Sequence, residues 1–412
     1  MKRREFLKHA STGAAGLAFG ASHWTSALAQ ETATKKVAAL DESLLTTPGS
    51  PIPIVTLKGT ARERGRIHGE ILKPHILRLC EQWRESLGRP EGMSPEEYIE
   101  RFVADTGFED AIARFTPDLL EEVEGIAEAT GLPYNTVFAM QLVDEEWWYS
   151  MNRDLVKDES ADKCTAIGVS KSDAGPSIVA QNMDIPAYAH GAMVLFHVKP
   201  KDSDLEALVL SYAGLICLNG MNNRGIAVCV NALLPLADAK DGLPVAFVNR
   251  GILERRTLEE AERFVLEIRH ASGQAYNIGS PQKVVCYECS AGKSVAFVPS
   301  PGATRFVHTN HPIVNDELSP LGRAVRDGTI KATGPKDSEA RYQAADQRIR
   351  DPAGPVSIET IRAALCSHDS EEHPVCRHGA TAACTIYELT DPPRAHCCKG
   401  PPCSGTFAVA GF

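Results

Sequence analysis

The stretch ADKCTAIGVSKSDAGPSIVAQNMDI, residues 161–185, decides the fold of this chain. From Cys164 onward, apolar residues recur with a period of two, a short turn follows, and a second run of the same kind ends at Asp184. This period is typical of β-strands. A cysteine at the start of a strand is most often a small buried apolar group. The pattern therefore asks what Cys164 does at the head of one strand, and what Asp184 does at the end of the next.

The predicted secondary structure differs on the two sides of Cys164. Residues 60–155 have helical spacing: Ser94, Pro95 and Glu97 form a capping-box start, and residues 131–133 break two helices apart. Further helices are expected at 257–271 (with a Thr257/Glu260 capping box), 337–349 and 357–367. Strands are expected at 164–169, 177–182, 192–198, 206–213, 225–233, 283–289, 293–300 and 383–389, with a hairpin turn at 222–225. Separate runs of strands and helices favour an α+β protein with antiparallel sheets.

The first 29 residues are expected to be a twin-arginine export signal. They contain the Arg3–Arg4 pair, a weakly apolar stretch and a small-residue cleavage site that ends at Ala29. The apolar stretch is too short to span a bilayer, and no cysteine follows at a lipid-attachment position. We expect a periplasmic protein without membrane insertion, in which residues 30–50 are a polar linker. The alternative is a chance arginine pair before an apolar helix.

The charge of the chain excludes some partners. The formal net charge is −10 over 412 residues. The expected signal carries four basic residues and one acidic residue, so its removal takes the net charge to −13. An acidic surface argues against nucleic acid and anionic lipid as partners.

The chain has 12 cysteines, all beyond the expected signal. An exported protein can form disulfides, and Cys397 or Cys398 with Cys403 is one candidate pair, although the connectivity cannot be deduced. The other interpretation is a zinc site built from Cys286, Cys289, Cys376, His378, His396 and Cys397. A second C-x-x-C pair is missing, and Cys286 and Cys289 would point to opposite faces of a strand. We therefore expect neither a metal nor another cofactor.

Cys164 differs from the other cysteines because the polar, acidic segment KDESADK precedes it, which predicts a surface loop. If that loop strains the Lys163–Cys164 peptide bond, the thiol can attack the Lys163 carbonyl and water can hydrolyse the resulting thioester. Cys164 would then carry a free α-amino group, whose ordinary pKa of about 8 suits a general base. One residue would supply both the nucleophile and its base.

Seven segments together resemble one family. They are DKCTAIGV…SIVAQNMDI, GTARERGRIHGE (59–70), EGIAEATGLP, GMNNRGIAVCVNAL (220–233), HTNHP (308–312), HPVCRHGATAACTIYEL (373–389) and GPPC (400–403). They resemble, in order, segments of the penicillin (acyl-coenzyme A:6-aminopenicillanic acid) acyltransferase family of N-terminal-nucleophile hydrolases, which is related to the choloylglycine hydrolases. The resemblance covers most of residues 55–405.

The resemblance implies a four-layer αββα sandwich of two antiparallel sheets. It also implies two chains cut from one precursor: a helical α chain, residues 30–163, and a catalytic β chain, residues 164–412. Two features depart from the family pattern. Lys163 stands where the family often has glycine, which puts the efficiency of cleavage in question, and the C-terminal segment HCCKGPPC is unusually rich in cysteine.

The family roles carry over to four positions. Cys164 would be the nucleophile and its amine the base, Asp184 would hold that amine, and Asn310 would donate to the oxyanion. Asn231 is a second candidate donor. A strand-end turn former is the alternative for Asp184, and a structural asparagine is the alternative for Asn231.

The resemblance also offers two arginines. Arg377 would orient the Asp184 side of the site or bind a substrate carboxylate. Arg341 competes for that role, and the residues alone do not decide between them.

Such a site performs acyl transfer. Coenzyme A is a cytoplasmic metabolite, so an exported protein is expected to hydrolyse a small amide and release its acyl group through a thioester. The alternative is an acyltransferase that moves an acyl group from a thioester or amide donor to an amine. Two other classes remain open: a disulfide-stapled binding protein on an inactive enzyme fold, and a metal-dependent hydrolase that uses the late Cys/His cluster.

Overall fold

The computed structural model describes residues 50–154, 164–172, 175–330, 334–350 and 355–412, all of which lie in one compact unit. The expected signal peptide and the expected cleavage loop with Lys163 lie outside the described residues. Within the described part, no helix is long and apolar enough to cross a membrane.

The strands in the described residues form two sheets. The eight-stranded sheet has the order β1 (Ile54–Gly59), β4 (Met193–Pro200), β5 (Ala207–Tyr212), β6 (Asn219–Asn222), β7 (Ala227–Ala232), β8 (Gln274–Gly279), β9 (Val284–Cys289) and β10 (Ser294–Ala296). The six-stranded sheet has the order β11 (Arg305–His308), β2 (Thr165–Val169), β3 (Ile178–Asp184), β12 (Thr381–Glu388), β13 (Arg394–Lys399) and β14 (Phe407–Ala410). All neighbouring strands are antiparallel except β1 and β4, which are parallel. No hairpin links β1 to β4, so nothing forces the antiparallel direction there.

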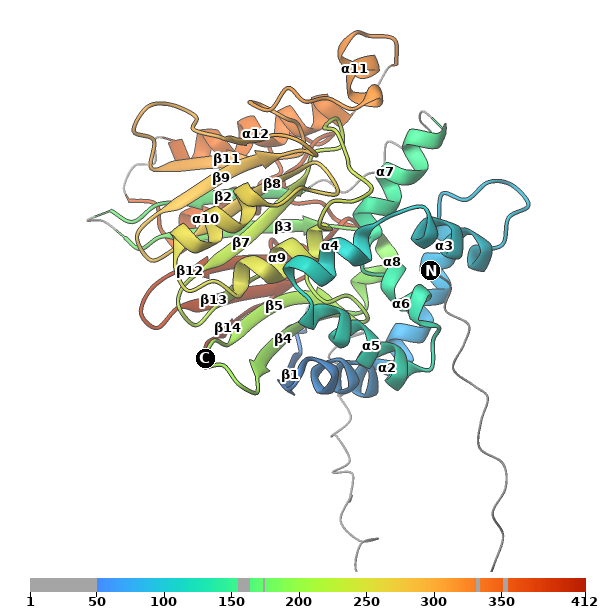
Figure 1. Ribbon diagram of the computed structural model, residues 1–412. Coiled ribbons are helices and arrows are strands. Elements are labelled where there is room, and N and C mark those ends of the chain that lie inside the picture. The colour runs from blue at the N-terminus through green and yellow to red at the C-terminus, as the bar shows by residue number, and fades with distance from the viewer. Residues whose placement is uncertain (1–49, 155–163, 173–174, 331–333, 351–354) are drawn as a thin grey trace, which may run out of the picture. The chain divides into compact units, whose positions relative to one another are not determined.

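The two sheets face each other between layers of helices (Figure 1). Strands β2 and β3 are buried along their whole length and contact β7 and β8 of the other sheet. Helices α9 (Val245–Leu253) and α10 (Leu258–Glu267) contact the eight-stranded sheet, while α12 (Gly334–Arg350) and α13 (Ile358–Leu365) contact the six-stranded sheet. The predicted αββα sandwich is confirmed.

The segment before Cys164 is mostly helical, as predicted, but it also contributes strand β1. Its helices are α2 (Ala61–Ser86), α3 (Pro95–Ala104), α4 (Phe108–Phe115), α5 (Asp118–Thr130), α6 (Tyr134–Ala139) and α7 (Val143–Asp154). The Ser94/Glu97 capping box is present, and Gly131 ends α5 at a φ of 79°, where the sequence predicted a break.

Helices α2 and α5 approach closely at two glycines. A Cβ on Gly65 would lie 1.9 Å from the carbonyl oxygen of Glu122, and a Cβ on Gly125 would lie 2.3 Å from the carbonyl oxygen of Arg62. Any side chain at either position would push the helices apart. Gly65 in GTARERGRIHGE and Gly125 in EGIAEATGLP therefore serve helix packing.

Two local predictions need correction. Helix α10 ends at Glu267 rather than at 271, and its capping is one-sided: the Thr257 side chain accepts from the Glu260 amide, but the Glu260 carboxylate accepts from the Arg256 amide. The strand prediction also missed β1, β6, β8, β11, β13 and β14. The remaining helices are the short α8 (Ala187–His190) and α11 (Pro320–Arg326).

Candidate active site

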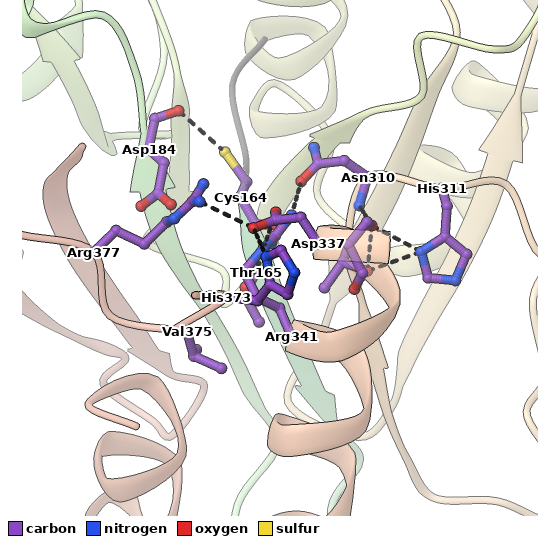
Figure 2. A network of polar contacts seen from close by, with 12 residues as sticks. Cys164, Thr165, Asp184, Asn310, His311, Asp337, Arg341, His373, Val375 and Arg377 are labelled. Atoms are coloured by element: carbon purple, nitrogen blue, oxygen red, sulfur yellow. Dashed lines mark hydrogen bonds and ion pairs between the residues drawn. The ribbon is translucent and has the colours of Figure 1, made fainter. Parts of the chain in front are cut away.

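The β2–β3 ladder places Cys164 in the interior between the sheets. Thr165 pairs with Asn182, so Cys164 at the head of β2 lies beside Met183. Its Sγ lies 3.6 Å from the Met183 Sδ. The same sulfur lies 3.9 Å from the Asp184 backbone oxygen (Figure 2). Cys164 packs in the core between the sheets and is 4% exposed. The period of two that the sequence showed is what turns this thiol inward.

Asp184 ends β3 with its carboxylate only half satisfied. Its Oδ1 accepts a hydrogen bond of 2.6 Å from the Thr381 hydroxyl. Its Oδ2 is buried and has no hydrogen-bond partner among the described residues. Burial raises the pKa of Asp184 to about 6, although the Thr381 hydrogen bond and the charges of Arg341 and Arg377 act in the opposite direction. A buried oxygen of this kind is costly unless a donor reaches it.

Arg341 of α12 holds the start of β2 in place. Its Nη1 donates to the Cys164 backbone oxygen at 2.8 Å and to the Thr165 hydroxyl at 3.0 Å. Its Nε donates to Asp337 and its Nη2 donates to the Asn310 Oδ1, both at 3.0 Å. The guanidinium is fully buried, and each of the hydrogen bonds named above goes to another part of the protein. This environment favours a positioning role over binding of a substrate carboxylate.

Asn310 follows β11 and points its amide toward the end of β7. Its Nδ2 donates to the Ala232 carbonyl at 3.1 Å, and its backbone amide donates to the Ser338 hydroxyl at 2.8 Å. An amide nitrogen carries two hydrogens. One of them is therefore left for an oxyanion, while Arg341 fixes the amide orientation through Oδ1.

Asn231 precedes Ala232 in β7 and so lies next to the residue that Asn310 contacts. Its Oδ1 accepts from the Asn277 Nδ2 at 3.2 Å. Its Nδ2 is buried without a hydrogen-bond partner in the described part of the chain. Asn310 thus contacts the backbone of the residue that follows Asn231, and both amides keep donor capacity.

Arg377 lies on the loop before β12 and joins the same network (Figure 2). Its Nη2 donates to the Asp337 Oδ1 at 2.9 Å, and its backbone amide donates to the Thr381 hydroxyl at 3.0 Å. The His373 Nδ1 lies 3.1 Å from the same Asp337 oxygen. Arg341 and Arg377 therefore converge on one buried carboxylate.

A cavity of about 60 Å³ opens beside Cys164. Its polar end holds Asp144, whose carboxylate accepts a 2.7 Å hydrogen bond from Gln274. Most of the lining is apolar and comes from Val143, Met183, Ile185, Pro186, Tyr188, Ala189, Tyr212, Leu215, Cys217, Leu218, Val230, Ala232, Val245 and Ala246. Such a wall suits an apolar group better than a charged one.

The sequence missed several members of the network, among them Asp337 and Thr381. A signal existed for Asp337, because it stands four residues before Arg341 on a predicted helix, the spacing of an ion pair. Thr381 carried no signal, because its contact with Asp184 joins strands far apart in the sequence.

Two facing sheets between helical layers, with a cysteine at the start of an inner strand, define the N-terminal-nucleophile hydrolase fold. Residues 170–391 match the family of acyl-coenzyme A:6-aminopenicillanic acid acyl-transferases, and the chain belongs to this family. The match begins after Cys164, so it does not itself identify the nucleophile.

Individual relatives are more distant. The chain is 26% identical over 274 residues to the 40 kDa form of acyl-coenzyme A:6-aminopenicillanic-acid-acyltransferase from Emericella nidulans, over 65% of this chain and 72% of that protein. It is 21% identical over 313 residues to protein dcd1A of Dictyostelium discoideum, over 65% of this chain and 66% of that protein, which is just under two thirds. A similar solved structure is the Caenorhabditis elegans ortholog of N-acylethanolamine-hydrolyzing acid amidase, with 17% identity, a TM-score of 0.41, and coverage of 55% of this chain and 93% of that one.

Proposed function

We propose that this protein is a self-processing cysteine amidohydrolase that cuts itself before Cys164 and then releases the acyl group of a small amide through a thioester. One observation carries the proposal: the backbone oxygen of Asp184 lies 3.9 Å from the Cys164 Sγ, and the Oδ2 of the same residue is buried and has no donor among the described residues. An α-amino group created at Cys164 would supply that donor. The proposed products are residues 30–163 and residues 164–412, after removal of residues 1–29.

In the processing step, the Cys164 sulfur attacks the Lys163 carbonyl carbon. The C–N bond breaks, the nitrogen takes the thiol proton, and a thioester forms. Water then hydrolyses the thioester, which gives the Lys163 carboxylate and restores the thiol. The 2.8 Å bond from Arg341 to the Cys164 carbonyl supports this step, because it fixes the residue from its other side.

In turnover, the new amine accepts the thiol proton and the thiolate attacks the substrate carbonyl carbon. Asn310, with Asn231 as a second donor, stabilises the oxyanion. The leaving amine takes the proton as the C–N bond breaks, and water hydrolyses the acyl thioester. Asp184 holds the amine throughout, with Arg377 and Thr381 as its supports.

The mostly apolar cavity supports an apolar acyl group, and its narrow volume of about 60 Å³ favours a small one unless the pocket opens. A second candidate is acyl transfer to an amine, which family membership and the name of the Emericella relative support. We favour hydrolysis because the proposed twin-arginine signal would deliver the enzyme to the periplasm, away from acyl-coenzyme A.

The first test compares the wild type with Cys164→Ala, using intact mass and N-terminal sequencing. The wild type should give two chains, the larger starting at Cys164 and the smaller starting at or near Gln30. Cys164→Ala should remain one chain after signal removal, whereas the control Cys80→Ala, at another buried cysteine, should be processed normally. Asp184→Asn should slow processing. Amide turnover by an uncut wild-type chain would refute the mechanism.

The second test identifies the reaction. Processed enzyme is incubated with N-acyl amides of graded acyl length, and separately with acyl-coenzyme A and an amine acceptor. We expect amide hydrolysis that depends on Cys164. Product formation only from acyl-coenzyme A would favour the acyltransferase instead.

A further inference from the structure

Outside the active site, thiol and imidazole side chains converge where three segments meet. His368 follows α13, Cys376 and His378 flank Arg377 before β12, and Cys403 lies in the turn between β13 and β14. The Cys403 Sγ lies 3.4 Å from the Cys376 Sγ, 3.2 Å from the His378 Nε2 and 3.9 Å from the His368 Nε2. The donor atoms of His368, Cys376 and Cys403 all lie within 4.8 Å of one another.

We propose that His368, Cys376, His378 and Cys403 bind a structural zinc ion. Around a tetrahedral zinc with bonds of about 2.3 Å to sulfur and about 2.0–2.1 Å to nitrogen, neighbouring donor atoms stand roughly 3.3–3.8 Å apart. The distances from the Cys403 sulfur to its three neighbours, 3.2, 3.4 and 3.9 Å, bracket that range. His368, Cys376 and Cys403 already lie within 4.8 Å of one another, and the His378 side chain would move toward the other two ligands to complete the tetrahedron.

The donor set favours zinc over a harder cation. Two thiolates and two imidazoles are ligands that select zinc, whereas magnesium and calcium prefer carboxylate and carbonyl oxygens. The two thiol protons would leave to solvent on binding. The exposed His368 and His378 rings stack with centroids 5.4 Å apart and a 25° angle, and both Nε2 atoms lie near the Cys403 sulfur.

A disulfide between Cys376 and Cys403 is the competing explanation. A disulfide needs a sulfur–sulfur distance of about 2.05 Å, and here the two atoms are 3.4 Å apart. It would also leave the convergence of both imidazoles on Cys403 unexplained. A metal ion accounts for all four side chains. The sequence alone did not favour this site, because it paired only Cys376 with His378.

The ion would stabilise the loop that supports the active site. Arg377 lies between two proposed ligands, donates to Asp337 through its side chain, and donates to the Thr381 hydroxyl through its amide. That hydroxyl in turn donates to Asp184. On the proposed function, zinc would therefore fix the residues that orient the carboxylate, without itself contacting the substrate.

The test measures zinc by elemental analysis in full-length protein expressed with zinc and purified without chelators. We expect about one zinc for each copy of residues 164–412, both in the wild type and in Cys164→Ala. Cys403→Ser should retain less than about a tenth of that amount. The matched control Cys366→Ser, at a neighbouring cysteine outside the set, should keep its zinc. His368→Ala changes an exposed side chain, so it tests the site without disturbing the core.

Cobalt substitution gives a second readout. A thiolate-to-cobalt absorption band should appear in the wild type and in Cys366→Ser and be absent in Cys403→Ser. Absence of zinc from the wild type would overturn the proposal, whether thiol titration then shows a Cys376–Cys403 disulfide or reactive thiols. Because Cys164→Ala should bind zinc without being processed, failure of this site and failure of the proposed function are distinguishable.

Discussion

Two buried carboxylates in this protein have opposite surroundings. Glu122 of α5 accepts from Arg64 at 3.0 Å and from Arg250 at 2.7 and 3.1 Å, so both oxygens are satisfied. Burial alone would raise its pKa, but the charges of Arg250 and Arg64 lower it to about 2. Asp184, equally buried, has one oxygen without a partner among the described residues and a pKa raised to about 6. The difference indicates that Glu122 serves the fold. On the proposed function, the free oxygen of Asp184 would accept a hydrogen bond from the new amine of Cys164.

The strongest test of this comparison is Glu122→Gln. It leaves two arginines buried without their counter-charge, so we expect the free energy of unfolding to fall by about 3–5 kcal/mol. Urea unfolding at pH 7 measures this. The control Glu124→Gln lies on the same helix and removes an exposed pair with Arg62, so it should change stability by at most about 1 kcal/mol. If the two variants lose the same free energy of unfolding, Glu122 has no special role in stabilising the fold.

Asn310→Ala tests whether the spare donor capacity of the Asn310 amide is functional. We expect kcat of the processed enzyme to fall by about 10²–10³-fold, because one oxyanion donor is lost. Steady-state kinetics of amide hydrolysis measures this. The control Asn135→Ala removes an exposed asparagine that donates to Glu100 and should leave kcat unchanged. A rise in KM with kcat unchanged would instead assign Asn310 to substrate binding.

Asp184→Asn probes the other side of the comparison, in a Cys164→Ala background so that the chain stays intact. A carboxyl whose pKa is raised on folding favours the folded state below its ordinary pKa of about 4, and this stability is lost as the pH rises to about 6. An amide does not ionise. The variant should therefore gain up to about 2–3 kcal/mol relative to its parent between pH 4 and pH 7. The urea midpoints of the variant and its parent are compared across this pH range. If their difference does not change with pH, the carboxylate of Asp184 already has its hydrogen-bond partners.

A third buried carboxylate, Glu145 of α7, lies outside the network of Asp184. Its Oε1 accepts from the Val245 amide and the Ser272 hydroxyl, and its Oε2 is buried without a partner in the described residues. Burial first and Asp144 second raise its pKa to about 7. Glu145→Gln should match its parent near pH 4 and exceed it by up to about 3 kcal/mol at pH 8. The exposed Glu128→Gln should show no such trend in the same unfolding series.

The sequence was informative where structure follows from local periodicity. The alternation after Cys164 predicted β2 and β3, and the capping residues predicted α3. Strand β1 was missed because six residues next to a helix carry little periodic signal. The β-strands near the C-terminus, β13 and β14, were missed because neither pairs through a recognisable hairpin turn.

For the site, the resemblance supplied Cys164, Asp184 and Asn310, which the structure brings into one network with Arg341 and Arg377. It could not supply their partners. The Thr381–Asp184 bond joins residues 197 positions apart, and the buried environment of Arg341 depends on how α12 packs against β2. For the Cys/His cluster, the sequence offered Cys376 and His378 as possible zinc ligands, but it could not add His368 and Cys403, because they come from separate segments.

Strand β1, Arg64 and Glu122 all precede Cys164, while their partners β4 and Arg250 follow it. If the bond before Cys164 is cut, the two pieces remain interleaved through a shared sheet and a common buried charge cluster. Separating them would strip an edge strand from its backbone hydrogen bonds and leave an ion without its counter-ion in the interior. The mature enzyme should therefore not come apart on dilution, and a piece that is lost should not be readily replaced by one supplied later.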